Sequence, residues 1–351
     1  MTPIMAVQSL AITAFLELSQ QHPVLDVRSP AEYAHAHIPG ARSLPLFTDE
    51  ERKVVGTLYK QKSREEAIKA GLDYFGGKMR PMVETVEDLF PKQAPGERTV
   101  LVHCWRGGMR SAGVAWLLDL YGFRVYTLQG GYKAWRRWAL EQFERPWPLR
   151  ILGGYTGSGK TEVLLRLQRQ GQPVIDLEGL AHHKGSAFGN IGLPPQPGQE
   201  QFENKLAWSL WQVSRQHPGA PIWVEDESQR LGDVNLPIVF WKQMRDQPLW
   251  FLEIPFEARL QHIVQEYGAL DRERVVNAIL RIKKRLGGLE TKEALLALVE
   301  DRVADSFRIL LTYYDRWYRK GLQNREELAS LLHTIACDRV HESNSQFLAH
   351  T

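Results

Sequence analysis

Residues 154–161 read Gly-Tyr-Thr-Gly-Ser-Gly-Lys-Thr, and this stretch decides the fold of half the chain. It fits the pattern G-x-x-x-x-G-K-[ST], with an apolar run (RILGGY) before the glycine-rich turn and an amphipathic stretch (TEVLLRLQRQG) after it. Between a strand and a helix, such a loop lets backbone N–H groups and the positive end of the helix converge on phosphate oxygens. We therefore predict a P-loop for a diphosphate or triphosphate, formed by Gly154, Gly157, Ser158, Gly159, Lys160 and Thr161, with the Thr161 hydroxyl placed to bind Mg²⁺.

Acidic residues at the ends of later strands are the expected partners of a P-loop, because a carboxylate there holds the metal ion or its water. Asp176 follows the apolar run PVI, and Glu225, Asp226 and Glu227 come at the end of the run PIWV. The pattern does not tell which of these side chains points toward the loop.

A second loop, residues 103–111, reads His-Cys-Trp-Arg-Gly-Gly-Met-Arg-Ser and joins an apolar run to a helical stretch. Loop N–H groups, the start of the helix, and the charges of Arg106 and Arg110 favour the thiolate form of Cys104. The same cradle suits an oxyanion beside the sulfur. Cys337 lies in the apolar stretch LLHTIACDRV, where we expect a structural residue in a helix.

The remaining pattern is that of an α/β protein with two domains. Of 351 residues, 43% are hydrophobic and 24% charged, with a net charge of +3, which excludes a disordered chain. Strands alternate with helices in both halves, which predicts parallel sheets. The proline-containing segment 143–149 predicts a linker, so we place the domains at residues 1–144 and 145–351.

Further expectations concern the C-terminal part of the chain, an exposed loop and the location of the protein in the cell. From about residue 256 the pattern is nearly all helical, and residues 185–200, rich in Gly and Pro, predict an exposed loop. No apolar run is long enough to span a membrane. The two cysteines and the lack of a secretion signal favour a cytoplasmic protein with no membrane partner.

Two chemistries fit the cysteine loop. Its pattern H-C-x-x-G-x-x-R-[ST], with five residues between Cys104 and Arg110, is that of cysteine-dependent phosphatases. Residues 26–33, 37–41 and 130–135 resemble the rhodanese (sulfurtransferase) domain, which shares its fold with cell-cycle phosphatases and ordinarily has a loop one residue shorter. A rhodanese-fold phosphatase with a nucleotide-binding regulatory domain therefore stays open, although no general acid is identified. A non-catalytic P-loop switch stays open as well.

A rhodanese-like domain followed by a P-loop domain resembles the tRNA 2-selenouridine synthase family over nearly the whole chain. The most specific segments are 104–111, 157–161 and 176–189. Within the last of these, Lys184 replaces an expected arginine, which keeps the charge but loses bidentate phosphate binding. In that family the longer cysteine loop is the normal form.

The resemblance implies an activity on tRNA that carries wobble 2-thiouridine. The sulfur would first be geranylated with geranyl diphosphate held by the P-loop, and selenophosphate would then supply selenium, with Cys104 as nucleophile or selenium carrier. It implies no tightly bound cofactor, geranyl diphosphate and selenophosphate as co-substrates, Mg²⁺ as a compatible metal, and a selenophosphate-producing enzyme as functional partner.

A tRNA partner requires positive surface. One predicted helix is crowded with Arg272, Arg274, Arg281, Lys283, Lys284 and Arg285, which are candidates for phosphate contacts. Another carries Arg316, Arg319 and Lys320 beside Tyr313, Tyr314, Trp317 and Tyr318, whose exposed members are candidates for base stacking. A solvated charged face and a set of core aromatics are the alternatives. His182 and His183 are candidates for an acid or base, or for structural hydrogen bonds.

Overall fold

The computed structural model describes residues 7–90, 98–186, 188–268 and 271–348. Its contacts divide the chain into two compact units, one ending at Glu141 and the other beginning at Gln142. Within the described ranges, no helix is both long and apolar enough to cross a membrane.

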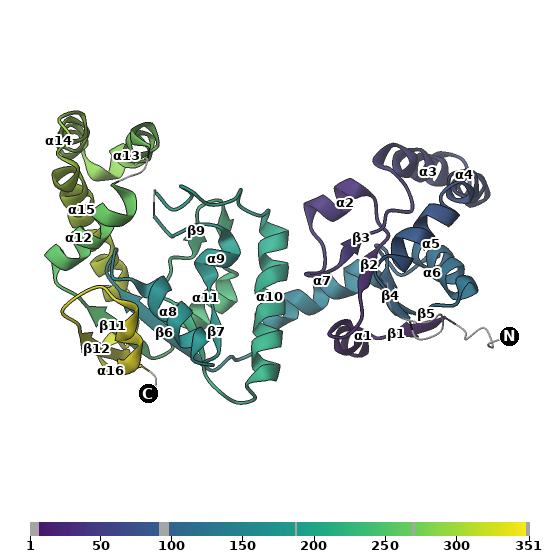
Figure 1. The fold of residues 1–351 in the computed structure, drawn as a ribbon, viewed down its shortest axis with the longest axis horizontal. Coiled ribbons are helices and arrows are strands. Elements are labelled where there is room, and N and C mark those ends of the chain that lie inside the picture. Colours follow the sequence, from purple (N-terminus) through teal and green to yellow (C-terminus); the bar gives the residue numbers. More distant parts are fainter. Residues whose placement is uncertain (1–6, 91–97, 187, 269–270, 349–351) are drawn as a thin grey trace. The chain divides into compact units, whose positions relative to one another are not determined.

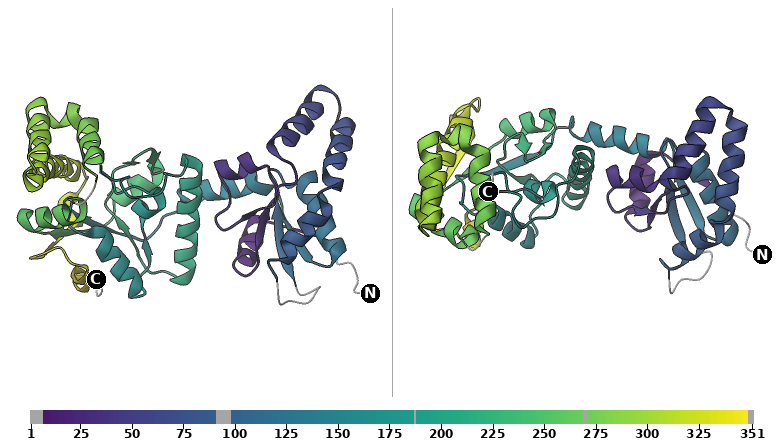
Figure 2. Two further views of the ribbon diagram at one scale, coloured as in Figure 1. Left: turned by 45° about the horizontal axis from the view of Figure 1, so that its top comes forward. Right: turned by 90° about the horizontal axis from the view of Figure 1, so that it is seen from above.

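The N-terminal unit is built on a parallel sheet of five strands in the order β1-β5-β4-β2-β3. Its strands are β1 (Gln8–Leu10), β2 (Val24–Asp26), β3 (Arg42–Ser43), β4 (Thr99–His103) and β5 (Arg124–Leu128). Helices α1 (Ile12–Ser19) and α7 (Gly131–Gln142) lie on one side of the sheet, and α5 (Met79–Glu87) and α6 (Met109–Tyr121) lie on the other (Figures 1 and 2). β2 and β4 are buried along their whole length, which explains their unbroken apolar runs. This is the predicted α/β fold.

Three helices for which no element was predicted enter between β3 and β4. They are α3 (Asp49–Gln61), α4 (Arg64–Gly76) and α5, and they follow the short helix α2 (Pro30–His35). Thr48 and Glu51 form a capping box at the start of α3, and Ser63 caps α4. Helix starts of this kind are visible in the sequence as S/T-x-x-E patterns.

The C-terminal unit contains a second parallel sheet of five strands, in the order β12-β11-β6-β8-β7. Its strands are β6 (Leu149–Gly154), β7 (Val174–Ile175), β8 (Ile222–Glu225), β11 (Leu249–Glu253) and β12 (Leu332–Ala336). Because β6 is central and the chain leaves it first toward β7 and later toward β11, a crevice forms beyond the carboxyl end of β6. The predicted P-loop lies at that end and leads into α8 (Lys160–Arg169).

Helices and a short antiparallel ribbon complete this unit. The ribbon pairs β9 (Arg230–Leu231) with β10 (Val234–Asn235). The helices are α9 (Leu177–Ala181), α10 (Gln199–Gln216), α11 (Ile238–Arg245), α12 (Phe256–Tyr267), α13 (Arg272–Leu286), α14 (Gly288–Val299), α15 (Val303–Gln323) and α16 (Leu328–Leu331). Between α9 and α10 the described residues form turns and coil, as predicted for the segment 185–200.

The prediction that the chain is nearly all helical after residue 256 is wrong at its end. β12 pairs in parallel with β11, in the register Leu249↔Leu332, and a 3₁₀ turn follows over Glu342–Phe347. Cys337 therefore follows a strand rather than lying in a helix, and its N–H donates to Glu253 O at 3.0 Å. Cys337 is buried in the core of this unit, as expected for a structural residue.

The segment 143–149, expected to be a linker, packs within the C-terminal unit. Phe143 and Trp147 are buried, and the Trp147 indole N–H donates to Gln142 O at 2.7 Å. The Gln243 side chain of α11 donates to Phe143 O at 2.9 Å. Both prolines of the segment therefore lie in a chain that is held by tertiary contacts.

Candidate functional site

The glycines of the P-loop hold backbone conformations that other residues rarely adopt. Gly154, Gly157 and Gly159 have φ values of 150°, 78° and 71°. A Cβ at Gly157 would lie 2.6 Å from Ile263 Cδ1, and one at Gly159 would lie 2.6 Å from Val340 Cγ1. The loop is thus packed between α12 and the C-terminal segment, and only glycine fits at these positions.

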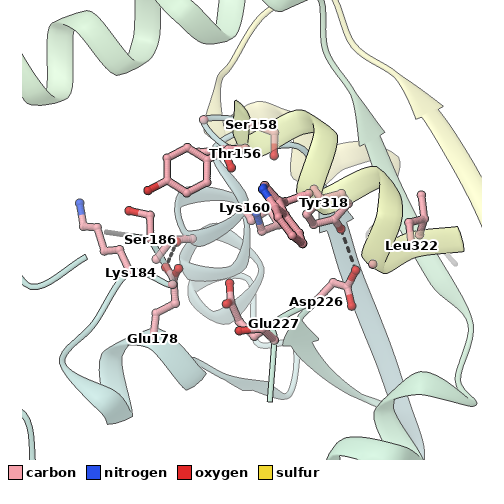
Figure 3. Close-up of a pocket in the computed structure, with 18 of the residues that line it drawn as sticks. Thr156, Ser158, Lys160, Glu178, Lys184, Ser186, Asp226, Glu227, Tyr318 and Leu322 are labelled. Carbon is pink, nitrogen blue, oxygen red and sulfur yellow. Dashed lines mark hydrogen bonds between the residues drawn. The ribbon is translucent and has the colours of Figure 1, made fainter. Parts of the chain in front are cut away.

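Lys160 and a group of carboxylates face the loop (Figure 3). The Lys160 ammonium donates to Gly154 O at 3.2 Å, and the Thr161 hydroxyl donates to Glu178 Oε2 at 2.9 Å. Glu178 in turn shares a hydrogen bond with Glu227. Burial raises the pKa of Glu178, and burial together with the charge of Glu178 raises the pKa of Glu227 well above its ordinary value.

The four predicted acidic positions have different roles in the structure. Asp176 caps α9, where its side chain accepts from Gly179 N, and Glu225 is fully buried and accepts from Leu177 N at 3.0 Å. Asp226 accepts from Tyr318 Oη at 2.7 Å, whereas Glu227 lines the pocket beside Lys160. Glu178 was not predicted, although it lies two residues after Asp176 on a helix that this aspartate begins.

Side chains of helices α12 and α15 form hydrogen bonds with the P-loop. Tyr318 Oη accepts from Gly154 N at 3.2 Å while it donates to Asp226, which is also paired with Arg325 at 2.6 Å. Arg259 donates to Thr156 O at 3.0 Å and forms a bidentate pair with Asp315 at 2.8 and 2.7 Å. Sequence patterns could not find these pairs, because their members lie far apart in the chain.

A pocket of about 1150 Å³ opens at the P-loop. Its polar end contains the loop, Lys160, Glu178 and Glu227. Its other walls include a group of apolar and aromatic side chains from α12, α15 and the segment after α9, namely Phe188, Ile263, Tyr267, Phe307, Leu310, Leu311 and Tyr314. The pocket therefore joins a phosphate cradle to a surface that suits a hydrocarbon.

The oxygen donors at this end fit Mg²⁺. The Thr161 hydroxyl and the carboxyls of Glu178 and Glu227 are hard ligands, and a cation beside them would offset the repulsion between the two glutamates. Among the described residues, no group of three or more His, Cys, Asp or Glu side chains could hold a metal ion alone.

In the N-terminal unit, the loop between β4 and α6 encloses the sulfur atom of Cys104. Cys104 is 3% exposed, and its Sγ lies 3.2 Å from Ser111 Oγ on α6. Burial raises the pKa of the thiol, but hydrogen bonds from Ser111 and from the N–H of Arg106, with the charge of Arg110, outweigh it, so the pKa is lowered. For Cys337, burial and Asp338 raise the pKa instead.

The two predicted arginines of this loop differ in their surroundings. The Arg106 side chain is exposed. Arg110 donates to Glu32 at 2.7 and 3.5 Å. Glu32 was not predicted as a site residue, although it caps α2 in a capping box with Ser29 that the sequence displays.

A buried ion pair packs against Tyr132, which contacts the cysteine loop. Arg28 forms a bidentate pair with Asp26, in which Nη2 lies 2.5 Å and Nε 2.9 Å from its oxygens, and both residues are at most 1% exposed. The Arg28 guanidinium lies 3.9 Å from the centre of the Tyr132 ring. Tyr132 N donates to Cys104 O at 2.8 Å. The segment 130–135 thus touches the loop directly.

The candidate tRNA-binding residues form two different groups. All six basic residues predicted on α13 are exposed, although Arg272 is paired with Asp301 and Arg285 contacts Tyr313. On α15, Tyr313 is buried and Tyr318 is half-buried, whereas Trp317 is 44% exposed. His182 bonds to Pro195 O at 2.8 Å, and burial lowers the pKa of His183. Neither histidine is in the lining of the P-loop pocket.

Together, the fold and the two loops define an α/β protein that joins a rhodanese-like domain, with a buried cysteine of lowered pKa, to a P-loop domain. Comparison with protein families agrees: residues 12–137 match the rhodanese-like domain and residues 147–345 match the tRNA 2-selenouridine synthase AAA domain. The chain belongs to the tRNA 2-selenouridine synthase family.

Individual relatives extend over most of the chain. The tRNA 2-selenouridine synthase of Shewanella loihica is 36% identical over 82% of this chain and 80% of its own, and that of Hydrogenovibrio crunogenus is 36% identical over 87% and 90%. Among solved structures, Saccharomyces cerevisiae Ygr203w, a homologue of single-domain rhodanese and the Cdc25 phosphatase catalytic domain, is 18% identical over 38% of this chain and 82% of its own, with a TM-score of 0.25.

Proposed function

We propose that this protein converts wobble 2-thiouridine in tRNA to 2-selenouridine in two steps, through an S-geranyl intermediate. The observation that carries the proposal is the pocket of the C-terminal unit, whose phosphate cradle continues into an apolar and aromatic wall. A prenyl diphosphate has these two parts, a diphosphate and a hydrocarbon, in one molecule. Family membership supports tRNA as the substrate.

In the first step the thiocarbonyl sulfur attacks C1 of the geranyl group, and the carbon–oxygen bond to the diphosphate breaks. The leaving diphosphate takes the electron pair, and Lys160 with the P-loop N–H groups stabilises its charge. When bound, Mg²⁺ would supply further positive charge to the leaving oxygens, held by Thr161 and the neighbouring glutamates. Glu178 positions the Thr161 hydroxyl through their hydrogen bond.

In the second step the selenium of selenophosphate attacks C2 of the base, a carbon–selenium bond forms, and the geranyl thiolate leaves with the electron pair of the carbon–sulfur bond. Water then cleaves the selenium–phosphorus bond, and phosphate is released. Cys104 acts here as nucleophile or selenium carrier. Its lowered pKa supports this role, because only the thiolate is a good nucleophile.

Mass spectrometry of tRNA nucleosides from cells with and without the protein tests the proposal. We expect 2-selenouridine to be lost without the gene, to return with the parent protein, and to stay absent with Cys104→Ser. Normal 2-selenouridine with Cys104→Ser would contradict the assigned role. Rapid Cys104-dependent hydrolysis of an aryl phosphate, with no selenouridine, would favour the phosphatase.

A further inference from the structure

An exposed indole lies beside the reactive cysteine. Trp105 directly follows Cys104 and is 38% exposed, whereas the thiol itself is 3% exposed. β4 and α6 flank this short loop, which therefore emerges at the carboxyl edge of the sheet, where ligands of such folds bind. The indole is thus the exposed side chain next in the chain to the buried sulfur.

The indole is held in place from behind. Its ring stacks on Tyr132, with the ring centres 5.6 Å apart and the planes at 30°. Tyr132 is fully buried and rests on the Arg28 guanidinium of the buried ion pair. The Trp105 backbone is held as well, because Lys133 N donates to Trp105 O at 3.0 Å. One face of a fixed aromatic ring is thus packed, while part of the side chain stays open to solvent.

Exposed cations accompany the ring. The side chains of Arg106, next in the chain, and of Lys133, bonded to the same loop through its backbone, are both exposed. A supported aromatic ring beside positive charge is the arrangement by which proteins hold an unpaired nucleotide, with the base on the ring and the phosphate near the cations.

We propose that Trp105 is a substrate-binding residue that stacks on the pyrimidine of the wobble nucleotide and so sets C2 of the base toward the Cys104 site. The assignment rests on the proposed function, since it takes tRNA as the substrate. Stacking fixes the plane of the base, and the buried thiol requires this because it can be reached only in a narrow range of orientations.

Single-turnover selenation of a pre-geranylated anticodon stem–loop, with selenophosphate supplied, tests this assignment. Trp105→Ala should raise the stem–loop concentration needed for half-maximal rate about tenfold, whereas Trp105→Phe, which keeps a ring, should stay within about threefold of the parent. Trp116→Ala is the matched control, because Trp116 is 52% exposed on α6 of the same unit. It should behave as the parent does.

Two further readouts separate binding from structure. The pH dependence of Cys104 alkylation should be the same in Trp105→Ala and parent, which shows that the loop is intact. If Trp105→Ala requires no more stem–loop than Trp116→Ala does, or if its alkylation profile accounts for the loss, the assignment is overturned. If the parent protein makes no selenouridine at all, both the proposed function and the assignment of Trp105 fail.

Discussion

In both units the central strand of a parallel sheet ends in a glycine-rich loop that leads into a helix: β4 and α6 around Cys104, β6 and α8 around Lys160. The surroundings differ. The first loop encloses a thiol among hydrogen-bond donors, which lower its pKa. The second presents a lysine and two protonatable glutamates to a large pocket with an apolar wall. Under the proposed function, one backbone design would thus serve a nucleophile in one unit and a leaving group in the other.

A buried arginine supports each of the two loops. Substitution of the one in the N-terminal unit, Arg28, is expected to have the largest effect. Arg28→Ala should leave the Asp26 carboxylate buried without its ion-pair partner, near the backbone N–H of residue 28, at 3.0 Å, and His103, at 3.7 Å. It should lower the free energy of unfolding of the N-terminal unit by about 3–5 kcal/mol. Hydrogen exchange in urea, read from peptides of each unit, measures this. Arg80→Ala is the control, because its pair with Glu84 is exposed to solvent and contributes little to stability. Equal effects of the two variants would show that the pair does not support the loop.

The leaving-group role of the P-loop is tested by Lys160→Ala. We expect geranylation of tRNA to slow about a hundredfold, because the charge that stabilises the diphosphate is removed. Selenation of tRNA that already carries S-geranyl-2-thiouridine should keep the parent rate. Liquid chromatography of nucleoside digests measures both steps. Equal slowing of both steps would refute the division between the two loops.

The basic surface of α13 belongs to the P-loop unit and should serve the tRNA in both steps. Replacing Lys283, Lys284 and Arg285 with alanine should weaken tRNA binding about tenfold and reduce the slope of log affinity against log salt by about two. Filter binding between low and moderate salt gives this slope. Arg302→Ala is the control, because Arg302 is already paired with Glu300 and Asp305. A slope unchanged by the triple substitution would make α13 a merely solvated face.

The smallest effect concerns the titration of Cys104. Ser111→Ala removes a hydrogen bond that lowers the thiol pKa, so the pKa should rise and the thiolate should form at higher pH. The rate of iodoacetamide alkylation against pH, with Cys337→Ala as background, measures this. A curve that stays in place would mean that the Ser111 hydroxyl does not stabilise the thiolate.

Local patterns predicted both loops, the parallel sheets and the basic helix, because each depends on residues that are neighbours in the chain. They did not predict β12, since a short edge strand depends on its pairing with β11 and not on its own sequence. Glu178 and Arg259 were missed as site residues, and Tyr318 was considered only for base stacking, because long-range packing brings these residues to the P-loop. The apolar wall of the pocket was hidden among the periodic apolar positions of α12 and α15, which look like ordinary core.

Under the proposed function each loop carries one step, and a relay between two variants separates the two steps. Substrate tRNA is incubated with the Cys104→Ser protein and geranyl diphosphate, purified, and then given to the Lys160→Ala protein with selenophosphate. We expect S-geranyl-2-thiouridine after the first incubation and 2-selenouridine after the second. Neither variant alone should make 2-selenouridine at the parent rate. The division of the two steps between the loops would be contradicted by either of two results. These are absence of the S-geranyl nucleoside after the first incubation, and no conversion of it to 2-selenouridine in the second.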